Sequence, residues 1–315
     1  DELLNEAQAA ILDVAEQRVK PGFVSVGQLT APTLEMIAQL AERREAVTGV
    51  PSGFRDLDNL TAGFHKSEFV VVAARPSMGK TALCLNISQH VGLNTRYAVG
   101  FFSMEMAKEQ ILIRLLCADS QLDIKRVRTG FISEREYEKL KLSAEALSHA
   151  RIFLDETAGL TVMEMKAKCR RLKMENNLDV VFIDYIQLMR PGSRFENRNQ
   201  EMAFISRSLK ELAKELQIPV VGISQLSRAP EKGRREPRPQ LSDLRESGAI
   251  EQDADVVIFI YRPEVYQPQD ETLRGLAEVN VAKQRNGPTD ILKLAFFNKY
   301  ARFANADLDF HYPEG

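Results

Sequence analysis

The chain has 315 residues, of which 44% are hydrophobic and 27% charged, an ordinary composition for one large globular domain or for one domain with an appendage. Its net charge of −2 excludes recruitment of nucleic acid by an overall electric field, and the lack of an apolar stretch of about 18 residues excludes a membrane-spanning helix. Cys84, Cys117 and Cys169 lie far apart in the sequence and form no Cys-x-x-Cys pair, so neither disulfides nor a zinc site is expected. Free cysteines are typical of a reducing compartment, and we therefore expect a cytoplasmic location.

The first 48 residues are predicted to form a helical linker segment. Residues 1–19 carry an apolar stripe at helical spacing, and a second helix is expected at Ala31–Arg44. The stripe requires a partner surface, which is either the chain's own core or a neighbouring subunit. Val50-Pro51-Ser52-Gly53 is a turn signal, so the main domain is expected over residues 49–315.

From residue 69 onward, short apolar runs alternate with amphipathic stretches, which is the pattern of a parallel sheet buried on both faces. Strands are predicted at Phe69–Ala73, Tyr97–Ser103, Ile152–Leu154, Val180–Asp184, Pro219–Ser224 and Asp255–Tyr261. Helices are predicted at Lys80–His90, Lys108–Ala118, Glu134–Leu147, Val162–Asn176 and Gln200–Leu216. Two later strands, Leu276–Lys283 and Ile291–Phe297, flank a short Gly-Pro connection and are predicted to form a hairpin. We therefore expect an α/β fold with a mostly parallel central sheet flanked by helices.

Residues 74–81, Ala-Arg-Pro-Ser-Met-Gly-Lys-Thr, follow the first predicted strand and lead into a helix. They fit the pattern G-x-x-x-x-G-K-[ST], except that Ala74 replaces the first glycine, which is tolerable if its φ stays negative. In this pattern backbone N–H groups cradle phosphates, the lysine reaches the β- and γ-phosphates, and the threonine binds Mg²⁺. The alternative is a chance Gly-Lys-Thr before a helix. The predicted nucleotide-binding residues are Ser77, Met78, Gly79, Lys80, Thr81 and Ala82.

Three further predicted strands end in, or just before, a polar residue that could serve the same site, because ligands bind beyond the carboxyl ends of parallel strands. Asp184 is expected to hold a metal-bound water beside Thr81, the alternative being an Asp that caps the next segment. Glu105 could orient and deprotonate the attacking water, or could simply be a favourable charge at the start of a helix. Gln225 could report the presence of the γ-phosphate, or could be an ordinary surface residue.

Two loops that follow predicted strands are rich in arginine and lysine. The first runs over residues 190–200 and contains Arg194, and the second runs over 228–245 and contains Arg228 and Arg245. A long segment without apolar periodicity is usually functional in a compact domain, and its cations suit the phosphate backbone of a nucleic acid. The alternative is a solvated charged loop. Because these loops carry almost no aromatic residues, base stacking is not expected there.

Lys283 and Arg285 are two residues apart near the end of a predicted strand, so their side chains share one face. Two adjacent cations repel each other unless an anion lies between them. An arginine finger that reaches a nucleotide phosphate would use this arrangement. An ordinary charged hairpin on the surface is the alternative.

Taken in order, these segments closely resemble the motor domain of bacterial replicative DNA helicases of the DnaB family, in the RecA-like group. The resemblance covers residues 50–310. It rests on Thr61-Ala62-Gly63-Phe64, residues 73–81, Phe102-Ser103-Met104-Glu105-Met106, Val181-Phe182-Ile183-Asp184-Tyr185, residues 223–228, residues 242–248 and residues 283–288.

The resemblance implies a P-loop NTPase that uses ATP, or another nucleoside triphosphate, together with Mg²⁺. It implies a ring hexamer, assembled through the N-terminal helix, that moves along single-stranded DNA and unwinds duplex, with primase and a helicase loader as further partners. The family's N-terminal collar domain is missing, so the chain is expected to be truncated.

For individual residues the resemblance implies that Lys80 and Thr81 hold phosphate and Mg²⁺, that Asp184 is the second acid and that Glu105 is the catalytic base. Gln225 would sense the γ-phosphate. The resemblance further implies that Lys283 and Arg285 act on the neighbour's nucleotide and that Phe297 stacks on the base. The implied DNA contacts are Arg194, Arg228, Arg245, Glu246 and Gly248.

Three other interpretations remain. The chain could be a recombinase-like filament protein whose hydrolysis only times release of DNA. It could be a regulatory ATPase or kinase with the same core, which would need no stimulation by DNA. It could also be a structural oligomer with a decayed site, although the presence of Lys80, Thr81, Asp184 and Glu105 speaks against that.

Overall fold

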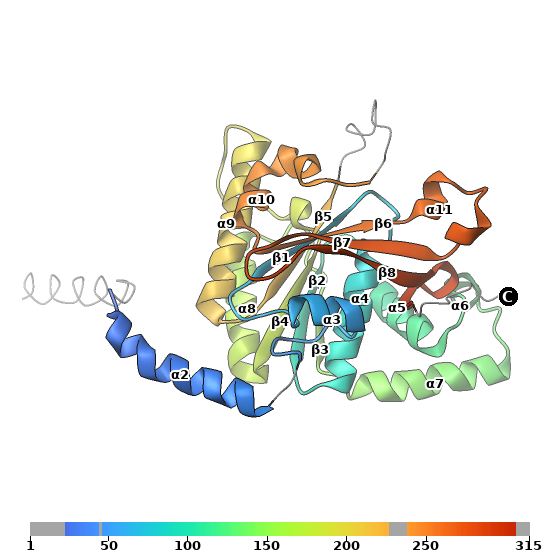
Figure 1. Ribbon diagram of the computed structural model, residues 1–315. Helices are drawn as coiled ribbons and strands as arrows, with labels where there is room; N and C mark the ends of the chain where they lie inside the picture. Colours follow the sequence, from blue (N-terminus) through green and yellow to red (C-terminus); the bar gives the residue numbers. More distant parts are fainter. Residues whose placement is uncertain (1–22, 44–45, 227–237, 307–315) are drawn as a thin grey trace, which may run out of the picture. The chain divides into compact units, whose positions relative to one another are not determined.

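The computed structural model describes residues 23–43, 46–226 and 238–306 (Figure 1). The chain divides into two compact units, residues 1–45 and residues 46–315. The predicted helix at residues 1–19 lies outside the described residues. The predicted boundary between residues 48 and 49 stays a prediction.

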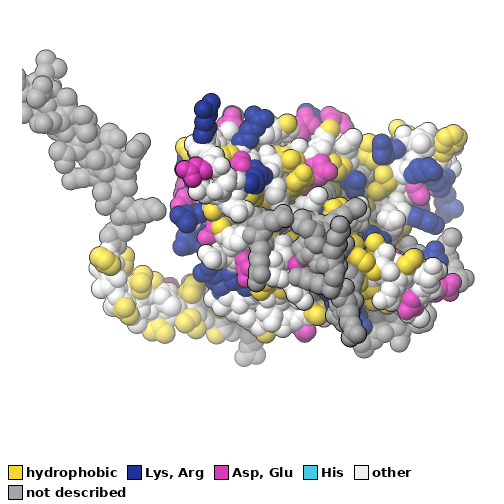
Figure 2. Space-filling view, turned by 90° about the horizontal axis from the view of Figure 1, so that it is seen from above, with side chains coloured by type: hydrophobic (Ala, Val, Ile, Leu, Met, Phe, Trp, Pro, Cys, Tyr) yellow, Lys and Arg dark blue, Asp and Glu magenta, His cyan; other side chains and the backbone are white. Residues whose placement is uncertain are grey.

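The described part of the first unit is helix α2, Val26–Arg43. It begins five residues before the predicted start, because Ser25 and Gln28 exchange hydrogen bonds of 3.3 Å between side chain and backbone and so cap the helix ahead of Pro32. The apolar side chains along α2 are exposed, as the yellow atoms of this helix in Figure 2 show. They include Leu29, Met36, Ile37 and Leu40, which recur at helical spacing.

The second unit contains a nine-stranded sheet in the order β3-β2-β4-β5-β1-β6-β7-β8-β9. The first six strands in this order are parallel to one another, and the last three pair antiparallel. Their bounds are β1 Phe69–Ala74, β2 Ala98–Ser103, β3 Ile152–Asp155, β4 Leu178–Asp184, β5 Val220–Gln225, β6 Val256–Tyr261, β7 Leu276–Gln284, β8 Asp290–Phe297 and β9 Arg302–Asn305. The predicted α/β fold, the mostly parallel sheet and the hairpin of the two late strands are confirmed.

Helices cover both faces of this sheet (Figure 1). The helices that sequence patterns predicted are α4 Lys80–Asn94, α5 Lys108–Ser120, α7 Glu134–Ser148, α8 Val162–Asn176 and α9 Arg198–Leu216. Shorter helices that the patterns did not predict are α3 Arg55–Thr61, α6 Ile124–Thr129, α10 Gly248–Asp253 and α11 Pro263–Tyr266, with 3₁₀ turns η1 Ile186–Leu188, η3 Leu241–Ser247, η4 Glu271–Leu273 and η5 Asn298–Tyr300. Strand β9 was missed as well: its sequence Arg-Phe-Ala-Asn lacks the apolar run that identified the equally short β3. Among the described helices, none combines the length and the apolar character needed to cross a lipid bilayer.

The hydrophobic core lies in two layers, one on each side of the sheet. Alternate residues of β1 enter different layers: Val70 and Val72 pack with α4, while Phe69 and Val71 pack with α9. All six residues of β1 are buried, which explains its uninterrupted apolar sequence. Burial of each valine or phenylalanine side chain of β1 stabilises the fold by about 1.5–3 kcal/mol. The central strand therefore gives a rigid base to the turn that follows it.

The carboxyl ends of β1, β2, β4 and β5 lie along one edge of the sheet, which we call the carboxyl edge. Register places Ser103 at the end of β2 beside Asp184, and Ala74 at the end of β1 beside Gln225. Residues that are far apart in sequence thus meet where a parallel sheet usually binds ligands.

Candidate functional site

The turn between β1 and α4 has the geometry of a phosphate cradle. Ser77 and Gly79 have positive φ values of 65° and 99°, and α4 begins at Lys80 with no side-chain cap and no acidic residue in its first turn. Its first backbone N–H groups are therefore available to an anion, which the helix dipole also favours. Ala74 is the last residue of β1 and keeps an extended backbone, as the substitution of alanine for glycine requires.

Lys80 lies beside this turn with only 8% of its surface exposed. Its ammonium donates to the Arg75 carbonyl oxygen at 3.4 Å. Burial lowers the pKa of Lys80, while the negative charges of Asp184 and Glu105 act in the opposite direction. The Arg75 carbonyl is a neutral acceptor, and a triphosphate would supply an anionic partner for this buried ammonium.

Thr81 and Asp184 form an oxygen pair suited to a hard cation. The Thr81 hydroxyl donates to Asp184 Oδ2 at 2.8 Å, and Asp184 is 1% exposed. Burial raises the pKa of Asp184 to about 6, and the nearby Glu105 charge acts in the same direction, against the Thr81 hydrogen bond and the charges of Lys80 and Arg114. Hydroxyl and carboxylate oxygens beside a phosphate cradle match the preferences of Mg²⁺, so these residues fit a Mg²⁺–nucleotide complex.

Glu105 follows β2 in a short turn at the carboxyl edge. The Ser103 hydroxyl donates to the Met106 carbonyl at 2.7 Å and accepts from the Met106 N–H at 3.2 Å, which closes the turn. The Met104 N–H donates to the Asp184 carbonyl at 2.8 Å and holds the turn against β4. Glu105 itself is exposed and lines the same cavity as Lys80 and Thr81.

That cavity has a volume of about 930 Å³. It is lined by residues of the phosphate turn and by cations from several elements. The cations that line it besides Lys80 are Arg114, Lys125, Arg128, Arg262 and Lys299. The side chains of Arg114, Lys125 and Arg128 form no hydrogen bond or ion pair with another described residue, so their charge is available to an anionic ligand.

Arg262 is a cavity residue that the sequence analysis missed. It donates to the Ser77 carbonyl at 3.3 Å, pairs with Glu264, and lies 4.3 Å above the ring centroid of Phe296. It directly follows β6, so the strand-end argument that selected Asp184 would have found it. Arg114, Lys125 and Arg128 had no such signal, because α5 and α6 reach the cavity only through tertiary packing.

Gln225 is the last residue of β5 and lines the cavity. Its backbone is fixed by Gln187, which donates to the Gln225 carbonyl at 3.1 Å and accepts from the Gln225 N–H at 3.3 Å. The side chain is exposed, and its amide forms no hydrogen bond with another described residue. Its position fits a residue that senses the γ-phosphate of a bound triphosphate.

Lys283 and Arg285 lie at the opposite edge of the sheet. Lys283 pairs with the start of β6, and the Arg285 N–H donates to the Asp255 carbonyl at 3.0 Å. The Lys283 ammonium donates to carbonyl oxygens near the end of α10, at 2.5 Å to Glu251 and 2.7 Å to Ala254, and Arg285 Nη2 donates to Gln252 at 2.8 Å. These carbonyls, together with the Asp255 carboxylate 3.5 Å from Arg285 Nε, explain how two cations lie side by side. Neither residue lines the cavity of its own chain.

The predicted base-stacking residue Phe297 lies beside the cavity and is not among its lining residues. Its ring stacks on Tyr300 with a centroid distance of 5.4 Å. The preceding Phe296 does line the cavity, since neighbouring residues of a strand point to opposite faces. Base stacking by Phe297 stays a prediction.

The predicted DNA contacts are only partly described. Arg194 is exposed in the loop between β4 and α9, and Gly248 is exposed as the first residue of α10. Arg245 and Glu246 belong to η3, but their side chains lie outside the described structure, as does all of Arg228. Both loops leave the carboxyl edge, on which the cavity lies.

Residues 49–305 match the family described as the DnaB-like helicase C terminal domain. A replicative DNA helicase DnaC of Bacillus subtilis is 44% identical over 98% of this chain and 68% of the relative, and a replicative DNA helicase DnaB of Geobacillus stearothermophilus is 43% identical over the same shares. The chain thus spans about two thirds of the length of these curated relatives.

Two solved structures are similar in fold and sequence. One, described as an ATPase domain, superposes with a TM-score of 0.85 at 37% identity, covering 91% of this chain and all of that one. A DnaB-like replicative helicase, studied together with its interactions with primase, superposes with a TM-score of 0.81 at 35% identity, covering 96% of this chain and 72% of that one. The second unit therefore has the α/β fold of DnaB-like helicase ATPase domains.

Proposed function

Because the chain belongs to the DnaB-like helicase C-terminal domain family, we propose that it is the motor of a replicative DNA helicase, an enzyme that hydrolyses ATP to move along single-stranded DNA. The relatives named as replicative helicases favour this function over a recombinase filament and over a regulatory ATPase. Within this proposal the linker comprises residues 1–48 and the motor residues 49–315, in the cytoplasm.

The observation that carries the proposal is the convergence at the carboxyl edge. Lys80 and the turn before it would bind the phosphates, and Thr81 and Asp184, which share a hydrogen bond beside the cavity, would hold Mg²⁺. When bound, the ion neutralises charge on the β- and γ-phosphates. Glu105 orients a water and accepts its proton as the water oxygen attacks the γ-phosphorus, while the bond from that phosphorus to the bridging oxygen breaks and ADP and inorganic phosphate are released. Gln225 contacts the γ-phosphate and loses that contact after hydrolysis.

The site is completed by a second copy of the chain. Lys283 and Arg285 lie at the edge away from the cavity, so within one chain they do not reach it. We assign them to the cavity of the neighbouring subunit, where they stabilise charge on the phosphoryl group during transfer. A repeated head-to-tail contact forms a ring when its rotation closes and an open filament when it does not, and we propose a closed ring of six copies.

The exposed apolar stripe of α2 is the proposed means of assembly. Leu29, Ile37 and Leu40 are between 40% and 52% exposed, and such side chains repeated at helical spacing require a partner surface. We propose that α2 docks on the adjacent subunit, together with or in place of the helix expected at residues 1–19. Primase and a loader are proposed as further partners of the ring.

Hydrolysis measured with and without single-stranded DNA, over a series of salt concentrations, tests this function. We expect DNA to stimulate hydrolysis at low salt and the stimulation to fade as salt rises, because phosphate contacts release counterions. Lys80→Ala is the negative control, and Lys66→Ala, an exposed lysine before β1, is its matched counterpart. Hydrolysis that is insensitive to DNA at every salt concentration would favour the regulatory ATPase instead.

A further inference from the structure

A buried ion pair joins the phosphate-binding turn to the segment that carries the proposed DNA contacts. Arg75 Nη2 lies 3.8 Å from Asp243 Oδ2, and the two side chains are only 4% and 0% exposed. Arg75 immediately follows β1, whereas Asp243 belongs to η3, far later in the chain. The pair is therefore a direct tertiary connection between two functional segments.

Stability alone gives a poor account of this pair. Removing two charges from water costs several kcal/mol per ion, and replacing such pairs with apolar residues is often neutral or stabilising. The positions around it, such as Ala73 and Leu244, show that apolar packing is available there. A buried ion pair under these conditions is better explained by a need for a defined arrangement of the two segments.

The Arg75 end of the pair is tied to the nucleotide site. The Arg75 carbonyl accepts hydrogen bonds from the Lys80 ammonium at 3.4 Å and from the Met78 N–H at 3.4 Å. A phosphate in the cavity competes with this carbonyl for the Lys80 ammonium. The residue whose side chain pairs with Asp243 is thus also a residue whose backbone oxygen contacts the lysine expected to bind phosphate.

The Asp243 end is tied to the DNA-contacting segment. Asp243 Oδ2 accepts from the Gln240 N–H at 3.0 Å, and the Asp243 N–H donates to the Gln240 carbonyl at 2.8 Å, which fixes the start of η3. The following residue, Leu244, is 2% exposed and packs in the core. Asp243 lies two residues before Arg245 and five before Gly248 in the sequence. Because the connecting segment is this short, a displacement of Asp243 would also displace the proposed DNA contacts.

We propose that the Arg75–Asp243 pair transmits the nucleotide state of the cavity to the DNA-contacting segment, so that the affinity for single-stranded DNA depends on which nucleotide is bound. This inference rests on the proposed function. Arg75 and Asp243 are positioning residues in it: we assign Asp243 no contact with the nucleotide or the DNA, and the Arg75 side chain acts through Asp243. Such coupling is reciprocal, because DNA must change nucleotide affinity by the same factor.

The test is the ratio of two dissociation constants for a fluorescent oligothymidine, one with ADP bound and one with a slowly hydrolysed ATP analogue. For the unaltered chain we expect these affinities to differ by about tenfold or more. Asp243→Asn removes the charge but keeps an oxygen for the Gln240 N–H, and the ratio should fall to about twofold or less. Arg75→Gln, which removes the other partner of the ion pair, should lower the ratio by the same amount. The double variant should lower it no further than either single variant does.

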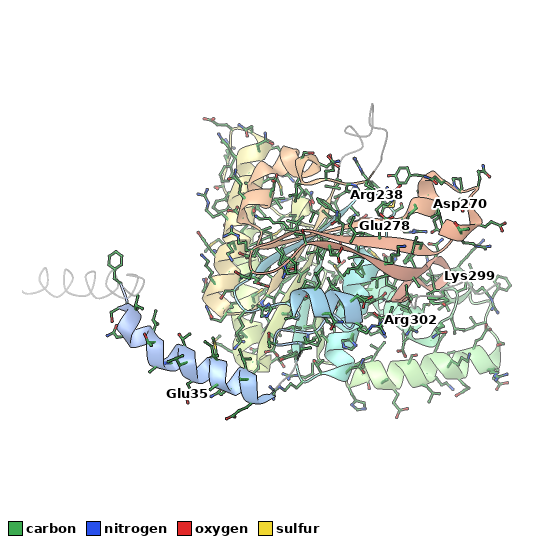
Figure 3. All side chains as sticks on the ribbon, viewed as in Figure 1. Glu35, Arg238, Asp270, Glu278, Lys299 and Arg302 are labelled. Carbon is green, nitrogen blue, oxygen red and sulfur yellow. The ribbon has the colours of Figure 1, made fainter. Side chains whose placement is uncertain are left out.

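A matched control is available in the same segment. Arg238, just before η3, forms a bidentate ion pair with Glu278 on β7, with N–O distances of 2.7 and 2.8 Å. The two side chains lie beside each other in Figure 3. Glu278→Gln weakens an anchor of the segment that does not lead to the phosphate turn. It should therefore leave the nucleotide dependence of DNA binding near its original value.

The outcomes separate the inference from the function on which it rests. An undiminished ratio in Asp243→Asn overturns the inference, and so does an equal loss of DNA affinity in both nucleotide states, which would indicate a merely structural role. A collapse of the ratio in Glu278→Gln as well also contradicts it. If the unaltered chain binds no single-stranded DNA at all, the proposed motor function fails, and with it the inference.

Discussion

The carboxyl edge of the sheet and the opposite edge hold their cations in different ways. At the carboxyl edge, Arg114, Lys125 and Arg128 line a cavity and form no hydrogen bond or ion pair with a described residue. At the opposite edge, Lys283 and Arg285 donate to backbone carbonyls near the end of α10. The first arrangement leaves positive charge available to an anionic ligand. The second arrangement holds two cations in fixed positions. A cationic group that stabilises charge on another subunit's substrate must be fixed in this way, so that it does not have to reorganise during the reaction.

Among the variants that test this comparison, Arg285→Ala is expected to have the largest effect on hydrolysis. If Arg285 acts on a neighbour's nucleotide, kcat for hydrolysis should fall by about 10³-fold while nucleotide affinity changes little. Steady-state hydrolysis and a fluorescent-nucleotide titration measure the two quantities. Arg171→Ala, which removes an arginine from a surface pair with Glu175 on α8, is the control and should be nearly neutral. A decrease in kcat of less than about fivefold would contradict the role of Arg285.

Glu105→Gln tests the carboxyl edge by itself. The amide keeps the shape of the side chain but cannot accept a proton from water, so kcat should fall by about 10²–10³-fold with nucleotide binding retained. Glu109→Gln, an exposed residue in the first turn of α5, is the matched control. If the two variants have the same kcat, Glu105 is not the base.

A site residue could be predicted from the sequence where its pattern is local, and could not where its position depends on tertiary packing. Gly79, Lys80 and Thr81 could be found because strand, turn and helix are contiguous, and Asp184 because it ends an apolar strand. The sequence also placed Lys283 and Arg285 on one face. It held no sign of the α10 carbonyls that bind them, because those contacts form only after β6 and β7 have paired. The cations of α5 and α6 could not be predicted for the same reason.

Other differences between expectation and structure have local causes. The second helix was expected to begin at Ala31, but the cap at Ser25 starts it earlier. Similarly, α9 begins two residues before its predicted start, because the Asn197 side chain accepts from the Gln200 N–H at 3.0 Å. Capping contacts thus set helix ends more reliably than the apolar period does.

Asp184→Asn should show that the carboxyl edge is built for binding at the expense of stability. The pKa of Asp184, raised to about 6 by burial, exceeds that of the unfolded chain, so the native state binds this proton more tightly. The resulting stability is complete at acidic pH and is lost as pH rises through the folded pKa. At pH 7.5 without nucleotide, Asp184→Asn should therefore stabilise the chain by about 1–3 kcal/mol, and less at pH 5.

Urea unfolding at the two pH values measures this gain. Asp155→Asn is the control of opposite sign. Burial would raise the pKa of Asp155, but hydrogen bonds from Lys168 and Thr157 prevail and lower it, so its removal should destabilise the chain. A gain in Asp184→Asn that grows as pH falls would contradict the account of this edge.

A smaller effect is expected from the helix proposed to bring the two edges together. Ile37→Ser combined with Leu40→Ser should weaken docking of α2, and hydrolysis at low protein concentration should fall by about three- to tenfold and recover as concentration rises. Sedimentation velocity reports the assembly directly. Glu35→Gln changes the charge on the same helix (Figure 3) and should leave both readings unchanged. A loss of activity that does not depend on protein concentration would mean that α2 has no part in assembly.

Mixing two inactive variants tests most directly whether the two edges of different subunits form one site. Lys80→Ala subunits retain Arg285, and Arg285→Ala subunits retain Lys80, so an equal mixture that assembles at random contains about a quarter of the original complete sites. We predict that hydrolysis reappears in the mixture although each variant alone is inactive. A mixture that remains at the average of its two parents, while sedimentation shows that the subunits have assembled together, would contradict the shared site.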